Sequence, residues 1–177
     1  MKTYNILGIN GSASSNSSNL RLLTIIGNLA GERFNLEILD DLSVLPHFRT
    51  ELTNVNTPME IIDFRNKIKN ADGVVICTPE YVFSIPSGLK NAIEWCVSTD
   101  VFSDKPIGLI TASANGEKGY EELKLIMQTV QTVFTAETTL LVPGIKGKLD
   151  ANGEPKSAEL KTDLEKLVYS FIGLIEK

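Results

Sequence analysis

The sequence predicts an α/β fold in which five parallel strands form one sheet with helices on both of its faces. Three observations support this prediction. Short apolar segments alternate with amphipathic ones, two of the short segments are apolar almost throughout, and small polar residues follow several of them. Such alternation is typical of a parallel sheet whose central strands are covered on both sides. The chain of 177 residues is long enough for one domain, spanning 1–177, with its own core.

Five segments have the length and composition of strands. Thr3–Leu7 is a short apolar run, and Phe34–Leu39 alternates apolar and polar residues as a strand with one wet face does. Val74–Cys77 and Pro106–Ala112 lack polar alternation, which is typical of central strands. Thr138–Val142 is the expected last strand.

Helices are predicted between these strands because apolar residues recur there at helical spacing. Thr57 is the expected cap of the second helix, with Pro58 in its first turn. The segments 42–57 and 143–155 lack a clear period and are expected to be loops. The predicted helices are Leu20–Ala30 with a stop at Gly31, Pro58–Ala71, one from near Ser87, one with an apolar face from Leu123 to Phe134, and Ala158–Ile175.

A polar loop, Gly8–Asn19, separates the first strand from the first helix. We interpret it as a phosphate cradle, because glycine allows close approach of the backbone and hydroxyls, amides and the free N–H groups of the next helix favour an anion. The loop contains no lysine or arginine and matches neither the Walker nor the dinucleotide fingerprint, so a terminal monophosphate suits it best. A flexible linker rich in serine and asparagine is the alternative.

Two further loops leave the same edge of the predicted sheet. Thr78–Pro86 follows the third strand with two aromatic residues that look exposed, and Ser113–Gly119 follows the fourth strand. Ligands of open α/β sheets bind beyond the carboxyl ends of the strands, where the winding reverses. A phosphate at the first loop and a flat ring at the second would therefore fit one ligand. A rigid turn with packed aromatic side chains is the alternative.

Composition argues against several classes of protein. The net charge of −5 and the scattered basic residues disfavour a nucleic-acid surface. No apolar run approaches the ~18 residues of a membrane span, and no signal peptide is recognised, so we expect a cytoplasmic protein. Cys77 and Cys96 lack metal or C-x-x-C spacing and are expected to be buried free thiols. His47 is expected to be a solvated loop residue rather than a catalytic base, and no metal site is expected.

Three motifs resemble those of a known family. They are G-S-x-x-x-x-S-x-N from Gly11, T-P-E-Y-x-x-S-I-P-x-x-L-K-N-A-I-E-W from Thr78, and G-I-K-x-K-L-D-x-N-G from Gly144. Together they resemble the NAD(P)H-dependent FMN reductases of the flavodoxin-like fold, which include azo-dye, quinone and chromate reductases. The resemblance spans nearly the whole chain and implies a three-layer α/β/α sandwich with strand order 2-1-3-4-5. It also implies an enzyme that uses bound FMN to pass electrons from NADPH or NADH to a small acceptor.

The resemblance implies particular site residues. Ser12, Ser17 and Asn19 would hold the FMN phosphate, the loop from Pro79 would line the flavin ring mostly through backbone groups, and no catalytic side chain is needed because the flavin performs the chemistry. If the N-terminus of the helix from near Ser87 points at the pyrimidine end of the ring, it would favour the negative charge of the reduced flavin. The expected cofactor-binding residues are Gly11, Ser12, Ser14, Ser17, Ser18, Asn19, Pro79, Glu80, Tyr81, Val82, Phe83, Ser113 and Gly116.

Two positions depart from the family pattern. The family often has arginine where this chain has Ser14, which bears on phosphate neutralisation and on the choice between NADPH and NADH, and Arg21 is a candidate substitute. The family often has asparagine where this chain has Val82, which removes one polar contact.

Three other functions are weighed against the reductase. A flavodoxin-like electron carrier is the alternative function, disfavoured by the modest net charge, and a phosphate-binding sensor is another. A low-molecular-weight phosphatase is excluded because Cys77 has no downstream arginine cradle.

Family members pair, which implies a homodimer or a dimer of dimers. Trp95, Val101 and Phe102 are candidate contact residues, with an ordinary core position as the alternative for Trp95.

Overall fold

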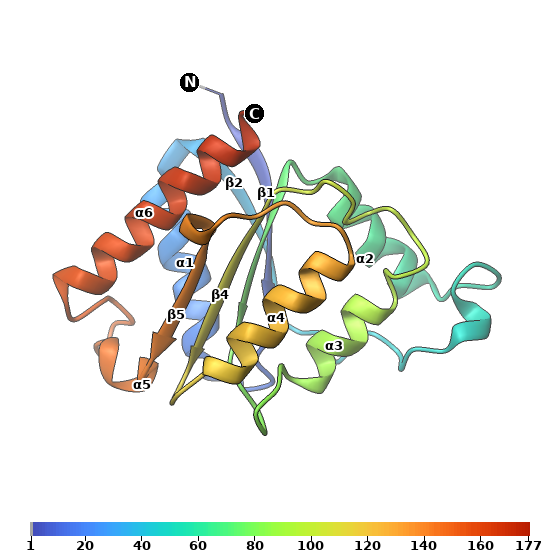
Figure 1. Cartoon of the computed structure of the whole chain (residues 1–177), viewed down its shortest axis with the longest axis horizontal. Helices are drawn as coiled ribbons and strands as arrows, with labels where there is room; N and C mark the ends of the chain where they lie inside the picture. Colours follow the sequence, from blue (N-terminus) through green and yellow to red (C-terminus); the bar gives the residue numbers. More distant parts are fainter. Residues whose placement is uncertain (1) are drawn as a thin grey trace.

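The five predicted strands form one parallel sheet in the order β2-β1-β3-β4-β5. The computed structural model describes residues 2–177 (Figure 1). The flavodoxin-like strand order is therefore confirmed, and the winding reverses at β1, because β2 lies on one side of it and β3, β4 and β5 lie on the other. The strands are β1 (Tyr4–Asn10), β2 (Phe34–Leu39), β3 (Gly73–Thr78), β4 (Ile107–Ser113) and β5 (Thr139–Pro143).

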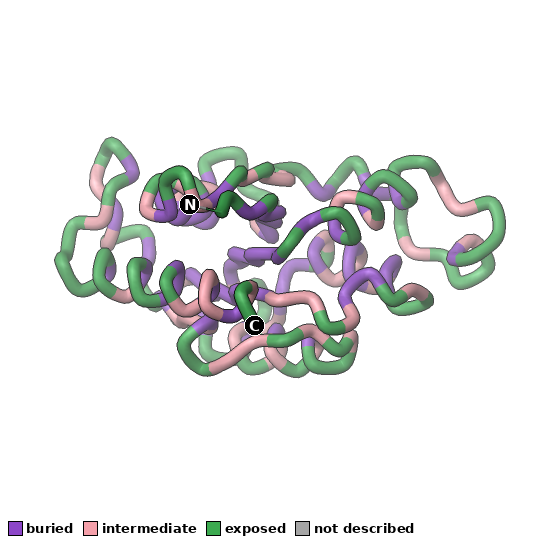
Figure 2. The backbone as a smooth tube through the Cα atoms, turned by 90° about the horizontal axis from the view of Figure 1, so that it is seen from above, coloured by how far each residue is buried: buried purple, intermediate pink, exposed green. Residues whose placement is uncertain are grey.

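Helices cover both faces of the sheet, each over its own apolar cluster. Helices α1 (Ser18–Ala30) and α6 (Ala158–Ile175) pack on one face, and α2 (Met59–Asn70), α3 (Ser87–Glu94) and α4 (Glu117–Thr129) pack on the other (Figure 1). Along the strands, alternate side chains belong to the two clusters, as in β3, where neighbouring residues point to opposite faces of the sheet. Figure 2 shows the buried backbone in the middle of the molecule and the exposed backbone at its rim.

Strand β1 is longer than predicted, and the loop therefore begins later than Gly8. Ile9 is 1% exposed and pairs with Leu39 and Ile76 in the flanking strands, so it belongs to the core of the sheet. Asn10 ends the strand in spite of its polar side chain, because its amide finds partners inside the protein, as described below.

Helix α4 is shorter than predicted, because it ends at Thr129 rather than continuing toward Phe134. Gln131 adopts a positive φ of 63°, which stops the helix, and Val133 then bridges Pro106 in extended conformation. Thr57 does not cap α2, because its hydroxyl donates to carbonyls in the preceding turn.

Short helical segments lie in the two predicted loops. Helix α5 (Ile145–Lys148) forms one turn after β5, inside the segment predicted as an irregular loop. A 3-10 turn at Thr50–Leu52 lies in the other, with two more at Gly31–Arg33 and Ala136–Thr138. Within residues 2–177, no helix combines the length and apolar composition that crossing a membrane requires.

The three candidate contact residues for a dimer lie in the core of the monomer. Trp95 is fully buried, its indole N–H donates to the Pro46 carbonyl at 2.7 Å, and its ring meets Phe48 edge to face. Val101 and Phe102 are buried with it. The core position given as the alternative for Trp95 is therefore the observed one, and the monomer buries all three candidate contact residues.

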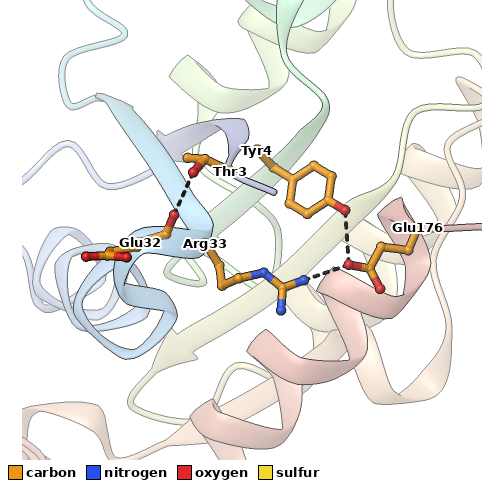
Figure 3. Close-up of polar contacts among 5 residues, drawn as sticks. All are labelled: Thr3, Tyr4, Glu32, Arg33 and Glu176. Atoms are coloured by element: carbon orange, nitrogen blue, oxygen red, sulfur yellow. Dashed lines mark hydrogen bonds and ion pairs between the residues drawn. The ribbon is translucent and has the colours of Figure 1, made fainter. Parts of the chain in front are cut away.

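At the amino-terminal edge of the sheet, a small polar cluster joins the two ends of the chain (Figure 3). The Tyr4 hydroxyl donates to Glu176 at 3.0 Å, and Arg33 forms an ion pair with the same carboxylate oxygen at 2.6 Å. This cluster lies at the opposite end of β1 from the polar loop, which leaves the carboxyl edge open for a site.

Candidate functional site

Two adjoining clefts open at the carboxyl edge of the sheet, where the winding reverses. The first cleft, of about 690 Å³, lies among the loops after β1, β3 and β4 and helix α5. The second cleft, of about 610 Å³, lies among the loop after β1, the end of β2 and the start of α3. Ser12, Ser14 and Tyr81 line both clefts. Both volumes fall in the range of small-molecule sites, and their place is the one that open α/β sheets use for ligands.

Asn10 organises the polar loop from its start. Its side chain is almost fully buried, and the amide donates to the Asp40 carboxylate at 2.8 Å. The amide oxygen accepts from the Ser12 backbone N–H at 3.1 Å and from the Ser17 hydroxyl at 3.3 Å. One side chain therefore fixes the end of β2, the first turn of the loop and the cap of α1. Sequence analysis missed this role, because Asn10 has the polar character of the loop that follows it.

Gly11 holds the loop against the neighbouring strand. Its N–H donates to the Cys77 carbonyl at 2.9 Å, and a Cβ at this position would lie 2.5 Å from the Thr78 hydroxyl oxygen. Only glycine permits this approach.

Two consecutive serine turns shape the middle of the loop. The Ser14 N–H donates to the Ser12 hydroxyl oxygen at 3.2 Å, and the Asn16 N–H donates to the Ser14 hydroxyl oxygen at 3.3 Å. Both hydroxyls act as acceptors here, so their protons can be donated to an anion in the clefts.

The other two polar residues expected at the phosphate have side chains already engaged in the protein. Ser17 caps α1 by accepting from the Leu20 N–H at 3.2 Å, and its proton goes to Asn10. The Asn19 amide donates to the Ala112 carbonyl at 3.3 Å, and its oxygen accepts from the Cys77 thiol. These two side chains therefore shape the loop rather than contact an anion directly. The N–H groups at the start of α1 are the donors that can bind one.

Both thiols are buried and unpaired, as predicted. Burial raises the pKa of Cys77 far above its ordinary value and that of Cys96 to about 12, so neither forms a nucleophilic thiolate at neutral pH. His47 is exposed in the loop after β2, also as predicted.

The loop after β3 ends in a tight, strained turn. Tyr81 and Ser84 exchange two backbone hydrogen bonds, of 2.8 and 3.1 Å, around Val82 and Phe83. These two residues adopt positive φ of 53° and 59°, and their side chains are 94% and 75% exposed. A β-branched residue in the left-handed region is a genuine outlier, which costs energy that the rest of the loop must offset.

Helix α4 holds this loop in place. The Glu80 carboxylate accepts from the Gly119 N–H at 2.8 Å, in the first turn of a helix whose own cap, Gly116, has no side chain. Glu122 accepts from the Ile85 N–H at 3.2 Å further along the same loop. Each carboxylate fixes the loop and satisfies a backbone donor, as a cap does.

The structure brings most of the expected site residues together, but not all of them. Gly11 lines the second cleft, whereas Glu80 and Gly116 brace the loop and helix α4, and Val82 and Phe83 lie at the exposed tip outside both clefts. Lining the first cleft are Ser12, Ser14, Ser17, Ser18, Asn19, Pro79, Tyr81 and Ser113. Not anticipated there are Asn16, Ala112, Ala114, Gly144, Ile145, Lys146 and Gly147.

The positive charge at the first cleft comes from Lys146 rather than Arg21. Arg21 donates to the Asn16 side chain at 2.9 Å and lines neither cleft. Lys146, on α5, is the one basic residue that lines the first cleft within the described part of the chain. The Gly-Ile-Lys motif contained this signal, but the segment was expected to be a loop. The start of α3 lines the second cleft.

We predict that Asn10→Ala lowers the free energy of unfolding by about 2–4 kcal/mol, because the buried Ser17 hydroxyl, the partly buried Ser12 N–H and the Asp40 carboxylate lose their hydrogen bonds to Asn10. Chemical denaturation measures the change. Ser15→Ala, at an exposed position of the same loop, should change stability by less than about 0.5 kcal/mol. An equal effect of both substitutions would contradict the role given to Asn10.

We predict that Val82→Asn raises the free energy of unfolding by about 1 kcal/mol, because asparagine tolerates the left-handed region and Val82 has almost no contacts to lose. Thermal unfolding tests this. Val97→Asn is the matched control, since Val97 is also exposed and its φ is not positive. A gain at both positions, or at neither, would show that strain is not the cause.

Known proteins are similar to this chain in sequence and in architecture. A subunit of the NADH:(hydroxy)cinnamate reductase of Vibrio ruber is 37% identical over 116 residues, which are 65% of this chain and 56% of that protein. An NAD(P)H-dependent FMN reductase of Pseudomonas aeruginosa is 35% identical over 62% of this chain and 60% of that protein. The chain thus spans less than two thirds of the length of these two relatives.

Solved structures show the same fold. The flavoenzyme NAD(P)H:(acceptor) oxidoreductase of Paracoccus denitrificans superposes with a TM-score of 0.87 over 98% of both chains at 24% identity. The sequence model of the family described as NADPH-dependent FMN reductase matches residues 4–146. Because that match covers most of its length, the chain belongs to the NADPH-dependent FMN reductase family.

Proposed function

We propose that this protein is an NAD(P)H-dependent flavin oxidoreductase that holds FMN in the first cleft and reduces a small acceptor, such as a free flavin, a quinone, an azo compound or a metal oxyanion. The observation that carries the proposal is the composition of that cleft. Hydroxyl donors and the start of α1 lie on one side, and Pro79, Tyr81 and Ser113 lie on the other. Membership of the FMN reductase family supports it.

The donors of the first cleft suit the phosphate of FMN. Ser12 and Ser14 each have a hydroxyl proton to donate, and the first N–H groups of α1 point out of the helix toward its N-terminal end. Lys146 adds a positive charge. A phosphate carries about −1.5 to −2 charge at neutral pH, so charge-assisted hydrogen bonds of about 1.5–3 kcal/mol each are available to it.

The phosphate site alone does not retain the cofactor. Nanomolar affinity requires about −12 kcal/mol after the cost of association. The rest must come from burying the ring against Pro79 and Tyr81. Because hydrogen bonds of Glu80 and Glu122 join the loop after β3 to α4, this wall is held in place before the ring arrives, which lowers the cost of ordering it on binding.

Bound FMN supplies the redox chemistry between the nicotinamide donor and the acceptor. The side chains of this protein bind and orient it, and no acid or base is required of them. On the resemblance, we further propose that the protein acts in the cytoplasm as a homodimer or a dimer of dimers.

We predict that the protein retains FMN and that anaerobic addition of NADH or NADPH, without an acceptor, bleaches the oxidised-flavin absorbance within seconds. Stopped-flow absorbance with each donor measures this. Retained FMN that neither donor reduces would contradict the reductase and favour the electron carrier. Failure to bind FMN at all would contradict the assignment of the first cleft.

We predict that Lys146→Gln weakens FMN binding about three- to fivefold, because it removes one exposed charge from the phosphate site. Fluorescence titration of the apoprotein with FMN measures the dissociation constant. Lys148→Gln, two residues away and outside the cleft lining, should leave it unchanged. The difference should shrink at high ionic strength, and a salt-independent loss would contradict the electrostatic role.

A further inference from the structure

The second cleft has the opposite electrostatic character to the first. Asp40 and Asp41, at the end of β2, line it, and no lysine, arginine or histidine of residues 2–177 does so. Its wall of Ser12, Ser14 and Tyr81 is shared with the first cleft. A ligand whose reactive ring lies at the first cleft can therefore continue into the second.

The floor of the second cleft offers backbone donors. Helix α3 begins at Ser87, its cap Pro86 has no side-chain acceptor, and Ser87 and Gly88 line the cleft. A Cβ on Gly88 would meet only Leu42, at 4.0 Å, so the first turn of the helix is open to a ligand. Free N–H groups at a helix start suit a diphosphate.

The two carboxylates differ in their availability. Asp40 is bound to Asn10. Asp41 is exposed, and only its Oδ1 atom accepts a protein hydrogen bond, from the Ser43 N–H at 2.8 Å. Hydrogen bonding to Ser43 lowers the pKa of Asp41 below its ordinary value, so the carboxyl group is ionised at neutral pH. An ionised carboxylate accepts hydrogen bonds from ribose hydroxyls and repels a phosphate monoester.

We propose that the second cleft binds the ADP-ribose half of the nicotinamide donor and that Asp41 selects NADH against NADPH. The inference rests on the proposed function, because the reductase requires such a donor. The diphosphate lies at the start of α3, and the adenosine ribose presents its 2′-hydroxyl to Asp41. The 2′-phosphate of NADPH would instead meet two carboxylates with no cation to neutralise it.

Nearby basic side chains do not supply that cation. Lys90, one turn into α3, is paired with Glu94 at 3.0 Å and lines a neighbouring hollow rather than the second cleft. Lys67, on α2, lines a separate hollow together with Asp41, but it is paired with Glu37 and lies outside the lining of the second cleft. Ser14, where the family often has arginine, brings no charge.

The test uses donor fragments that lack the nicotinamide, so that binding is separated from reduction. The FMN-loaded protein is titrated calorimetrically with ADP-ribose and with 2′-phospho-ADP-ribose. We expect ADP-ribose to bind at least about tenfold more tightly, since a phosphate dianion close to a carboxylate is disfavoured by more than 1 kcal/mol. In Asp41→Asn, which keeps an acceptor for the Ser43 N–H, the preference should fall to less than about threefold.

Glu165→Gln is the matched control, because it removes one exposed charge from α6, on the other face of the sheet. It should leave the preference unchanged, and thermal unfolding with FMN content verifies that each variant is folded. Equal binding of both fragments, binding of neither, or an unchanged preference in Asp41→Asn overturns the inference. If NADH still bleaches the flavin in that case, the proposed function stands. If selective ADP-ribose binding depends on Asp41 but no donor reduces the flavin, the inference holds and the proposed function fails.

Discussion

The four hydrogen bonds around the Asn10 side chain are the constraint on which the rest of the site depends. Asn10 ends the strand at which the winding reverses, so it faces β2 on one side and the loop to α1 on the other. Its buried amide must be satisfied there. It does this by binding Asp40, the Ser12 N–H and the Ser17 hydroxyl, with a longer contact to the Asp40 carbonyl. The position of both clefts follows, because their shared wall begins at Ser12.

The loop after β3 obeys a different constraint. It carries two residues in a left-handed conformation that neither favours, and it is stable only because α4 holds it through Glu80 and Glu122. Gly119 makes this possible, since a Cβ there would lie 3.1 Å from the Glu80 Cβ. The loop after β1 is thus held by the hydrogen bonds around Asn10, whereas the loop after β3 depends on its contacts with α4. A ligand between the two loops would contact one wall that is fixed by the hydrogen bonds around Asn10 and another wall whose strained turn is held by α4.

Periodicity allowed the strands and the long helices to be predicted, because each depends on apolar residues at fixed spacing. The strand order was implied by the resemblance to the flavodoxin-like reductases. The site was harder to predict, for physical reasons that differ by residue. Asn10 looks like a loop residue because satisfaction of its amide is a tertiary effect. Ser17 looks like a phosphate ligand, but a serine before a helix is equally a cap. The sequence around Trp95 is equally consistent with burial in the monomer and with burial between two copies of the chain. Its contacts to Pro46 and Phe48 show that it is buried in the monomer.

Ser14 connects the two clefts, and its identity affects both. Its hydroxyl oxygen accepts from the Asn16 N–H, an interaction that arginine cannot make, so the serine helps to shape the loop that presents donors to a phosphate. An arginine here would also place a cation on the wall shared by the two clefts and would offset one of the two carboxylate charges in the second cleft. With serine, positive charge reaches the first cleft from the opposite side, through Lys146. With serine at position 14, the first cleft has Lys146 as its one basic lining residue, and the second cleft has Asp40 and Asp41 but no basic residue, within the described part of the chain.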